Sequence, residues 1–295
     1  MHISSISLFT VAAPPIVGSF IVLALADVGW GIWGTHLVAI FLACGLAMSG
    51  ALIKKAGHCR FATFAIVILT LIGLAIPLLG ESSEPERWMS VGPLMLYAAP
   101  LFLPSFIAAC SVFVSKDGKH QIVSLAAVIG AAVILSFQPD ASQVLGLLVA
   151  SVVVVMQFRL GIFKLSLVVV PMLLITIWVF SLPDPLAPVP YVEEVFALGL
   201  SHSLFAGIAI IVSAIALVVG LWIKSMKGPL WLSAVAAYYA SLFACSIAGL
   251  TPAPLVGYGA GPILGFGLML GTLRCLEPQL LPNNPIQPTA NVSAD

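Results

Sequence analysis

The chain has 295 residues, of which 61% are apolar and 7% are charged, and its mean hydropathy is +1.18. Soluble globular domains carry about 25% charged residues, so this composition excludes a water-soluble fold. Basic and acidic residues number 11 each, and this zero net charge gives no indication of a nucleic-acid partner.

Ten apolar stretches are long enough to cross a bilayer, since a spanning helix needs about 20 mostly apolar residues. The predicted helices are residues 7–26, 29–53, 61–80, 93–114, 121–138, 141–158, 165–182, 195–223, 229–250 and 260–276. The sequence therefore predicts an all-α, polytopic integral membrane helix bundle, with one transmembrane domain over residues 1–277. Residues 278–295 are rich in Pro and Asn and are predicted to form a disordered cytoplasmic tail.

The charged residues are sorted by sign between alternate gaps. One set of gaps holds ten of the eleven basic residues, which are Lys54, Lys55, Arg60, Lys116, Lys119, Arg159, Lys164, Lys224, Lys227 and Arg274. The other set holds eight of the eleven acidic residues, which are Asp27, Glu81, Glu84, Glu86, Asp140, Asp184, Glu193 and Glu194. Loops rich in Lys and Arg stay in the cytoplasm, so both termini are predicted to be cytoplasmic and the acidic loops external.

The first helix has an alternative interpretation as a cleaved signal peptide, because Ala24-Leu25-Ala26 resembles a cleavage site. Residues 1–7 contain no Lys or Arg, whereas a signal peptide begins with a basic region. A retained first helix is therefore favoured, and either interpretation leaves Asp27 outside.

The first candidate site segment is residues 86–93, which contains Arg87-Trp88, and Arg87 is the one basic residue outside the basic gaps. A guanidinium can form two parallel hydrogen bonds to a phosphate or carboxylate, so Arg87 is a candidate for binding an anion. The alternative is a simple membrane anchor, because Trp favours the headgroup level.

The second candidate segment is Gln138-Pro139-Asp140, between the fifth and sixth predicted helices. The residues themselves favour a tight turn in which Pro139 ends one helix and Asp140 caps the next. Such a turn is compatible with a role in shaping a site.

The third segment, residues 183–197, has four prolines in its first eight positions, which keep the chain extended and stiff. Glu193 and Glu194 follow at the start of the eighth predicted helix. A carboxylate in partly dry surroundings can act as a general base. The alternative, which the residues alone favour, is that both glutamates complement the helix dipole.

The fourth segment, residues 251–262, contains three glycines around Tyr258. It resembles part of a nucleotide-binding loop only weakly, because no βαβ unit precedes it. Irregular backbone lining a cavity at membrane depth is the better interpretation. Four-residue glycine spacings continue into the tenth helix and predict close helix packing at Gly261, Gly265, Gly267 and Gly271.

Two histidines, His36 and His202, lie within predicted spans. An ionisable residue inside a membrane is a functional candidate by default. The alternative for each is a hydrogen bond across the bundle.

Taken in order, these segments resemble the SEDS family, the FtsW/RodA/SpoVE-type cell-wall proteins, from about residue 81 to 275. Gln138-Pro139-Asp140 matches the family's Gln-Pro-Asp motif. Residues 86–92 resemble its Arg-Trp-x-x-x-Gly segment, and Asp184-Pro185-Leu186 resembles the Asp-Pro-Leu/Phe-Gly run of its large outer loop. Residues 191–197 are similar to its His-Thr-Asp-Phe-Ile-Phe-Ala segment, and residues 255–261 to its C-terminal Pro-Phe-Ile-Ser-Tyr-Gly-Gly-Ser segment.

This resemblance implies a multi-pass protein of the bacterial cytoplasmic (inner) membrane that serves peptidoglycan synthesis, cell shape or cell division. The family polymerises a lipid-linked disaccharide precursor at the outer face, usually with a penicillin-binding partner. The family's catalytic Asp falls on Glu193, which would deprotonate the acceptor sugar hydroxyl, and a divalent cation at the lipid diphosphate is left open. The implied substrate-binding residues are Arg87, Trp88, Gln138, Asp140, Asp184, Glu194 and Tyr258.

The chain also departs from the family pattern. The family's Gln-Pro-Ser-Glu-x-x-Lys segment falls on residues 97–103, where its Glu and Lys are missing, and the large outer loop is short. These losses keep open a non-catalytic relative that binds lipid-linked precursor or acts as a scaffold for a division or elongation complex. A small-molecule transporter is a further alternative, although it should have polar residues at the midplane and paired broken helices.

Overall fold

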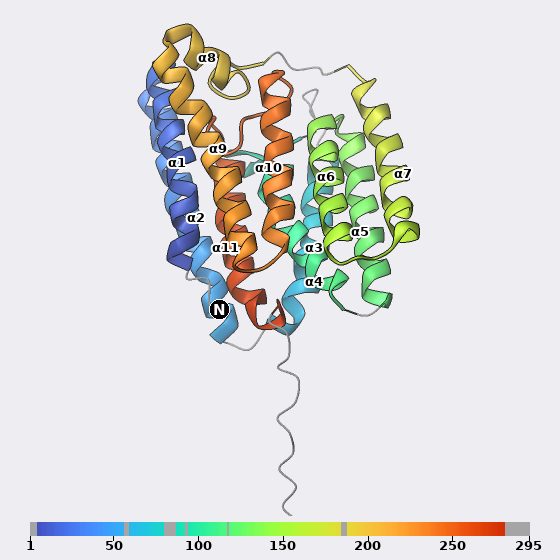
Figure 1. The fold of residues 1–295 in the computed structure, drawn as a ribbon. Helices are drawn as coiled ribbons and strands as arrows, with labels where there is room; N and C mark the ends of the chain where they lie inside the picture. Colours follow the sequence, from blue (N-terminus) through green and yellow to red (C-terminus); the bar gives the residue numbers. More distant parts are fainter. Residues whose placement is uncertain are drawn as a thin grey trace, which may run out of the picture.

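The structure is a computed structural model that describes residues 5–55, 59–79, 87–91, 94–116, 118–183 and 188–280. The described residues form a helix bundle with one short β-hairpin (Figure 1). The helices are α1 Ser5–Leu25, α2 Trp30–Lys55, α3 Cys59–Ala75, α4 Ala98–Val114, α5 Gly118–Phe137, α6 Ala141–Gln157, α7 Ile162–Phe180, α8 Val195–His202, α9 Leu204–Met226, α10 Trp231–Ile247 and α11 Ala260–Leu280. A 3₁₀ turn η1 spans Ile76–Leu79, and the hairpin pairs β1 Trp88–Val91 with β2 Leu94–Tyr97.

The predicted membrane bundle is confirmed. Five helical segments have the length and apolar composition to cross a membrane, and they are Trp30–Lys55, Phe61–Leu79, Gly118–Phe137, Ile162–Phe180 and Leu204–Met226. Five shorter apolar helices of 17 residues complete the set within the described chain, and they are Phe9–Leu25, Ala98–Val114, Ala141–Gln157, Trp231–Ile247 and Ala260–Leu276. Each falls on one of the ten predicted spans.

Helix α4 forms the centre of the bundle, and nearly all of its side chains are buried. It packs against α11, α3 and α5, while α10 packs against α6 and α9, and α1 packs against α9. Helices on the outside keep apolar faces exposed, as Phe163 and Leu174 do on α7. Such faces are the surface that bilayer lipid covers, because lipid tails are as apolar as the side chains.

The glycines of α11 allow close packing on two sides, as their spacing predicts. A Cβ on Gly267 or Gly271 would overlap the backbone of α2 at Ala43 and Leu46. A Cβ on Gly265 would overlap the backbone at Pro100, on the α4 side. Helix α11 is therefore held between α2 and α4, and its glycines set the distance to both.

Two predicted spans differ in detail from the structure. Residues 94–97, expected at the start of a helix, form β2, and the helix begins at Ala98. The hairpin satisfies its own backbone groups where the chain enters the bundle, which is how irregular backbone is tolerated at a membrane. The eighth span is two helices, because Ser203 is extended (φ −164°) and its hydroxyl caps α9 by accepting from the Ala206 N–H at 3.1 Å.

The beginning of α1 and the end of α11 lie at the same end of the bundle (Figure 1). Lys54 and Lys55 at the end of α2 share that end, called here the basic end. The opposite end carries the hairpin, the α5–α6 turn, α8 and the α10–α11 loop, and it is called the outer rim. That the basic end faces the cytoplasm stays a prediction from the charge pattern.

Candidate functional site

The outer rim brings together candidate segments that are far apart in the sequence. The hairpin, the α5–α6 turn and the α10–α11 loop form one cluster around Arg87 and Asp140. The loop before α8 and the α10–α11 loop form a second cluster around Glu193 and Tyr258. Residue Asp184, a predicted site residue, lies outside the described residues.

Arg87 is buried and hydrogen-bonded to the backbone of the α5–α6 turn. Its Nε donates to the Gln138 carbonyl oxygen at 2.9 Å, and an Nη donates to the Pro139 carbonyl oxygen. Carbonyls beyond a helix C-terminus lack intrahelical partners and carry partial negative charge, so a guanidinium is well suited to them. Arg87 thereby ties the hairpin to the end of α5, a role that the sequence alone did not indicate.

The side chain of Gln138 is also buried, and it is hydrogen-bonded to the last turn of α3. Its amide nitrogen donates to the carbonyl oxygen of Leu74, while its Oε1 has no hydrogen-bond partner among the described residues. A buried acceptor without a donor is uncommon in proteins.

Asp140 joins the hairpin to α6. The Tyr97 hydroxyl donates to Asp140 Oδ2 at 2.7 Å, and Oδ1 accepts a longer 3.4 Å bond from the Gln143 N–H, as the predicted helix cap requires. Burial raises the pKa of Tyr97 well above its usual value, and the negative charge of Asp140 raises it further. The phenol therefore stays protonated and remains the donor. Thr251, at the start of the α10–α11 loop, lies beside the same phenol.

The polar network continues into the bundle through Gln143 and Tyr238. The Tyr238 hydroxyl donates to Gln143 Oε1 at 2.6 Å, linking α10 to α6, and both residues are buried. Sequence reasoning missed Tyr97, Gln143 and Tyr238. The available signal was a polar side chain inside an apolar span, which usually faces the bundle interior.

Trp88 stacks on Tyr97, with ring centroids 5.1 Å apart and an interplanar angle of 27°. The two residues are direct partners in the hairpin register, so their side chains share one face of it. Trp88 remains half-buried at the rim. An indole in this position can stack against a sugar ring or rest at the lipid headgroup level, as expected for Arg87-Trp88.

Glu193 lies in a turn that precedes α8. Its Oε2 accepts a 2.8 Å hydrogen bond from the Val189 N–H, and its backbone carbonyl accepts 2.9 Å from the Ser246 hydroxyl of α10. The side chain is half-buried, whereas that of Glu194 is exposed. Glu194 occupies the N-cap position of α8 but makes no side-chain cap hydrogen bond, so its contribution there is limited to the helix dipole.

The Glu193 turn is attached to the α10–α11 loop by backbone hydrogen bonds. Ala253 N–H donates to the Val192 carbonyl at 3.0 Å, and Tyr258 N–H donates to the Tyr191 carbonyl at 2.9 Å. A Cβ at Gly257 would come within 2.6 Å of the Val192 carbonyl oxygen, so this close approach requires glycine. The third and fourth candidate segments therefore form one unit, which places Glu193 and Tyr258 on the same patch of the rim.

The two candidate histidines have different surroundings. His36 is buried in α2 and shares a 2.7 Å hydrogen bond between its Nε2 and the Ser19 hydroxyl of α1, so it bonds across the bundle. It also stacks on Tyr258 with centroids 6.3 Å apart, which connects α2 to the second cluster. His202 is exposed at the end of α8. Within the described residues no three His, Cys, Asp or Glu side chains gather to hold a metal ion.

Fold and rim together define a polytopic helical membrane protein with a polar, aromatic surface at one end. Its fold is similar to that of RodA, the rod-shape-determining protein of Thermus thermophilus. The RodA crystal structure superposes with a TM-score of 0.70 at 18% identity over 92% of this chain and 96% of RodA. A RodA variant gives a TM-score of 0.72 at 18% identity, over 92% of this chain and 97% of that one.

A chain from a peptidoglycan synthase complex that coordinates polymerization and crosslinking is also similar. Its TM-score is 0.68 at 17% identity, and the match covers 94% of this chain and 98% of that chain. No protein-family model and no curated protein matches the sequence. The SEDS-type fold expected from the outer segments is thus confirmed by structural similarity over nearly the whole chain.

Proposed function

We propose that this chain is a divergent SEDS-type protein of the bacterial cytoplasmic membrane that works in cell-wall synthesis. The observation that supports this most is the meeting of the four candidate segments at one rim of a RodA fold. The RodA-like chain of a peptidoglycan synthase complex supports a lipid-linked peptidoglycan precursor as substrate and a penicillin-binding protein as partner.

In this proposal Glu193 is the general base. Its carboxylate takes the proton from the acceptor sugar hydroxyl as the hydroxyl oxygen attacks the anomeric carbon of the donor. The bond from that carbon to the lipid diphosphate breaks, and the diphosphate leaves. A positioned base of this kind contributes about 10²- to 10⁴-fold in rate. Attachment of the Glu193 turn to α10 and to the α10–α11 loop would hold the carboxylate in place.

The other predicted site residues divide into two roles in this proposal. Arg87, Gln138 and Asp140 position the rim, because their side chains are engaged within the protein. Arg87 is therefore assigned to positioning the rim, in place of the direct contact with the donor diphosphate that its guanidinium suggested. Trp88, Glu194 and Tyr258 have exposed or half-buried side chains and would contact the substrate, as would Asp184. A divalent cation that accompanies the diphosphate would be brought by the substrate.

A second candidate function is non-catalytic binding of the same precursor. The observation that favours it lies at the start of α4, where the family's Glu and Lys fall on Pro100 and Leu103. Both side chains are buried in the apolar centre of the bundle. The charged pair of the family is therefore replaced by packing in this chain.

The two functions are separated by assaying purified full-length protein with lipid-linked precursor, alone and with a penicillin-binding partner. Glu193→Gln is compared with Glu194→Gln, a neighbouring carboxamide control. Catalysis predicts glycan polymer from the native protein and at least a 100-fold loss in Glu193→Gln. Glu194→Gln should lose at most about tenfold, because the Glu194 side chain would contact the substrate without taking its proton. Saturable precursor binding without polymer from any variant would support the binding function. Absence of both would reject the proposal.

A further inference from the structure

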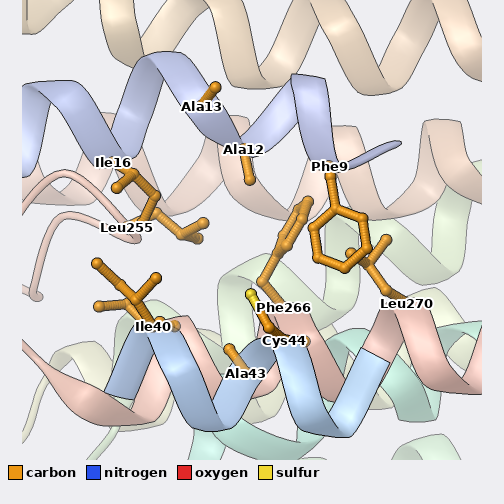
Figure 2. Close-up of a pocket in the computed structure, with 12 residues that line it drawn as sticks. Phe9, Ala12, Ala13, Ile16, Ile40, Ala43, Cys44, Leu255, Phe266 and Leu270 are labelled. Carbon is orange, nitrogen blue, oxygen red and sulfur yellow. The ribbon is translucent and has the colours of Figure 1, made fainter. Parts of the chain in front are cut away.

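A groove of about 180 Å³ lies between α1, α2 and α11 and reaches the α10–α11 loop at Leu255 (Figure 2). Its wall on α1 is a stripe of residues three or four apart, which places them on one helix face. The opposite wall is a similar stripe on α2, and the floor is α11 with Leu255. The lining is Phe9, Ala12, Ala13, Ile16, Ile40, Ala43, Cys44, Leu255, Ile263, Phe266, Gly267 and Leu270.

The groove opens sideways toward the surrounding bilayer. The floor residues Leu255, Phe266 and Leu270 are almost fully buried, whereas Ala13 and Cys44 on the two walls are exposed. Helix α1 packs mainly on α9 and α2 packs mainly on α11, so the space between α1 and α2 is left for the groove. Every lining side chain is apolar or a thiol, so what fills the groove must be apolar as well.

One end of the groove is closed by a polar pair. Ile16, Leu255 and Ile40 gather at this end (Figure 2). One turn further along the two walls, Ser19 and His36 are hydrogen-bonded to each other across α1 and α2. This end points toward the outer rim, because His36 also stacks on Tyr258.

The other end leads to a cation at the basic end of the bundle. Phe9, Phe266 and Leu270 gather there (Figure 2), and Arg274 follows Leu270 by one helical turn. The Arg274 guanidinium lies over the Phe9 ring, 6.0 Å from its centroid, and donates to the Ala47 carbonyl at 2.9 Å. Lys55, at the end of α2, adds an exposed positive charge on the same side.

We propose that this groove binds one acyl chain of an anionic phospholipid from the leaflet at the basic end, with the headgroup beside Arg274. The length of the groove fits an acyl chain within one leaflet. The seven residues from Phe9 to Ile16 rise about 10 Å, and one leaflet contains roughly 15 Å of hydrocarbon. Its volume exceeds that of the ~150 Å³ apolar cavity that is known to hold benzene. Basic residues between helix ends attract anionic headgroups.

The position of Arg274 favours a phospholipid over the lipid-linked precursor as the occupant of the groove. A lipid-linked precursor used at the outer rim would have its diphosphate at that end, and there the groove is closed by Ser19 and His36. Arg274 lies at the opposite end, where a phospholipid of that leaflet has its phosphate. The bound chain would also fill the gap between α1 and α2, restoring contacts that an empty groove forfeits.

The test counts lipids retained by the purified full-length protein, using native mass spectrometry with added phosphatidylglycerol, phosphatidylcholine or undecaprenyl phosphate. Ala12→Trp fills the groove from the α1 wall, where Ala12 points into the space (Figure 2). Val17→Trp introduces the same indole on an exposed face of α1 and is the matched control. Arg274→Gln removes the charge, and Arg274→Lys keeps it.

We expect one phosphatidylglycerol held at least tenfold more tightly by the native protein and Val17→Trp than by Ala12→Trp. Arg274→Gln should weaken it about fivefold, whereas Arg274→Lys should weaken it less, because one basic residue near an anionic lipid has about that effect. Equal retention by Ala12→Trp and Val17→Trp would overturn the proposal. So would preferential retention of undecaprenyl phosphate, or no preference for phosphatidylglycerol over phosphatidylcholine.

Discussion

The Tyr97 hydroxyl donates a 2.7 Å hydrogen bond to the Asp140 carboxylate across 43 residues of sequence, and both residues are buried. This bond connects the end of the hairpin to the start of α6. Arg87 connects the beginning of the same hairpin to the end of α5, through the carbonyls of Gln138 and Pro139. The Gln-Pro-Asp turn is therefore held from both ends of the hairpin.

Removing the Tyr97 hydroxyl should destabilise the protein. Tyr97→Phe leaves the buried Asp140 without this donor, and we expect a loss of about 1–3 kcal/mol. Tyr239→Phe is the matched control, because the Tyr239 hydroxyl is buried and has no hydrogen-bond partner among the described residues. Thermal unfolding in a fixed detergent should give a lower Tm for Tyr97→Phe only. Equal shifts in both variants would contradict the assignment.

The contribution of Tyr97 should depend on pH in one direction. Its pKa is raised by burial and by Asp140, so the folded protein keeps the phenol protonated at a pH where the unfolded chain loses the proton. The stabilisation is complete below the unfolded pKa of about 10 and is lost as pH rises above it. The Tm difference between native protein and Tyr97→Phe should be constant from about pH 7 to 9 and shrink above about 10. A difference that grows above that pH would show the opposite linkage.

Arg87 should act through position and not through direct contact with an anion. Arg87→Lys keeps the charge but cannot reproduce the rigid planar pair of donors that the guanidinium directs at the two carbonyls. We expect both Arg87→Lys and Arg87→Gln to lower stability by about 1–3 kcal/mol. Precursor affinity per folded molecule should change less than threefold in Arg87→Lys, as measured by equilibrium binding. A normal Tm with lost affinity in Arg87→Gln would instead indicate direct diphosphate binding.

Gly257 should be required for the unit that carries Glu193. Gly257→Ala places a methyl group 2.6 Å from the Val192 carbonyl oxygen, so the two loops must separate. Gly259→Ala is the control, because its Cβ would meet Pro262 at an ordinary 3.5 Å. We expect at least a tenfold loss of precursor turnover or affinity in Gly257→Ala, with the helical circular dichroism spectrum unchanged. Equal activity in both variants would show that loop contact is dispensable.

How far the fold could be predicted depends on how local each signal is. The spans follow from hydropathy along one stretch of chain, because the bilayer requires every segment that crosses it to be apolar. The glycine spacing of α11 likewise predicts close packing from one helix alone. Residues 94–97 were wrongly predicted as helix, since a short apolar run fits helix and strand equally and pairing with residues 88–91 decides between them.

The sequence by itself determined the membrane class, the ten spans, the Asp140 turn and the end of the bundle where the candidate residues gather. Only the tertiary structure decided that Arg87 bonds to the α5–α6 turn, that Tyr97 reaches Asp140 and that Tyr238 reaches Gln143. These pairs are separated by 51, 43 and 95 residues, so no local pattern specifies them. Buried polar groups must find partners wherever packing places them, and that packing belongs to the whole bundle.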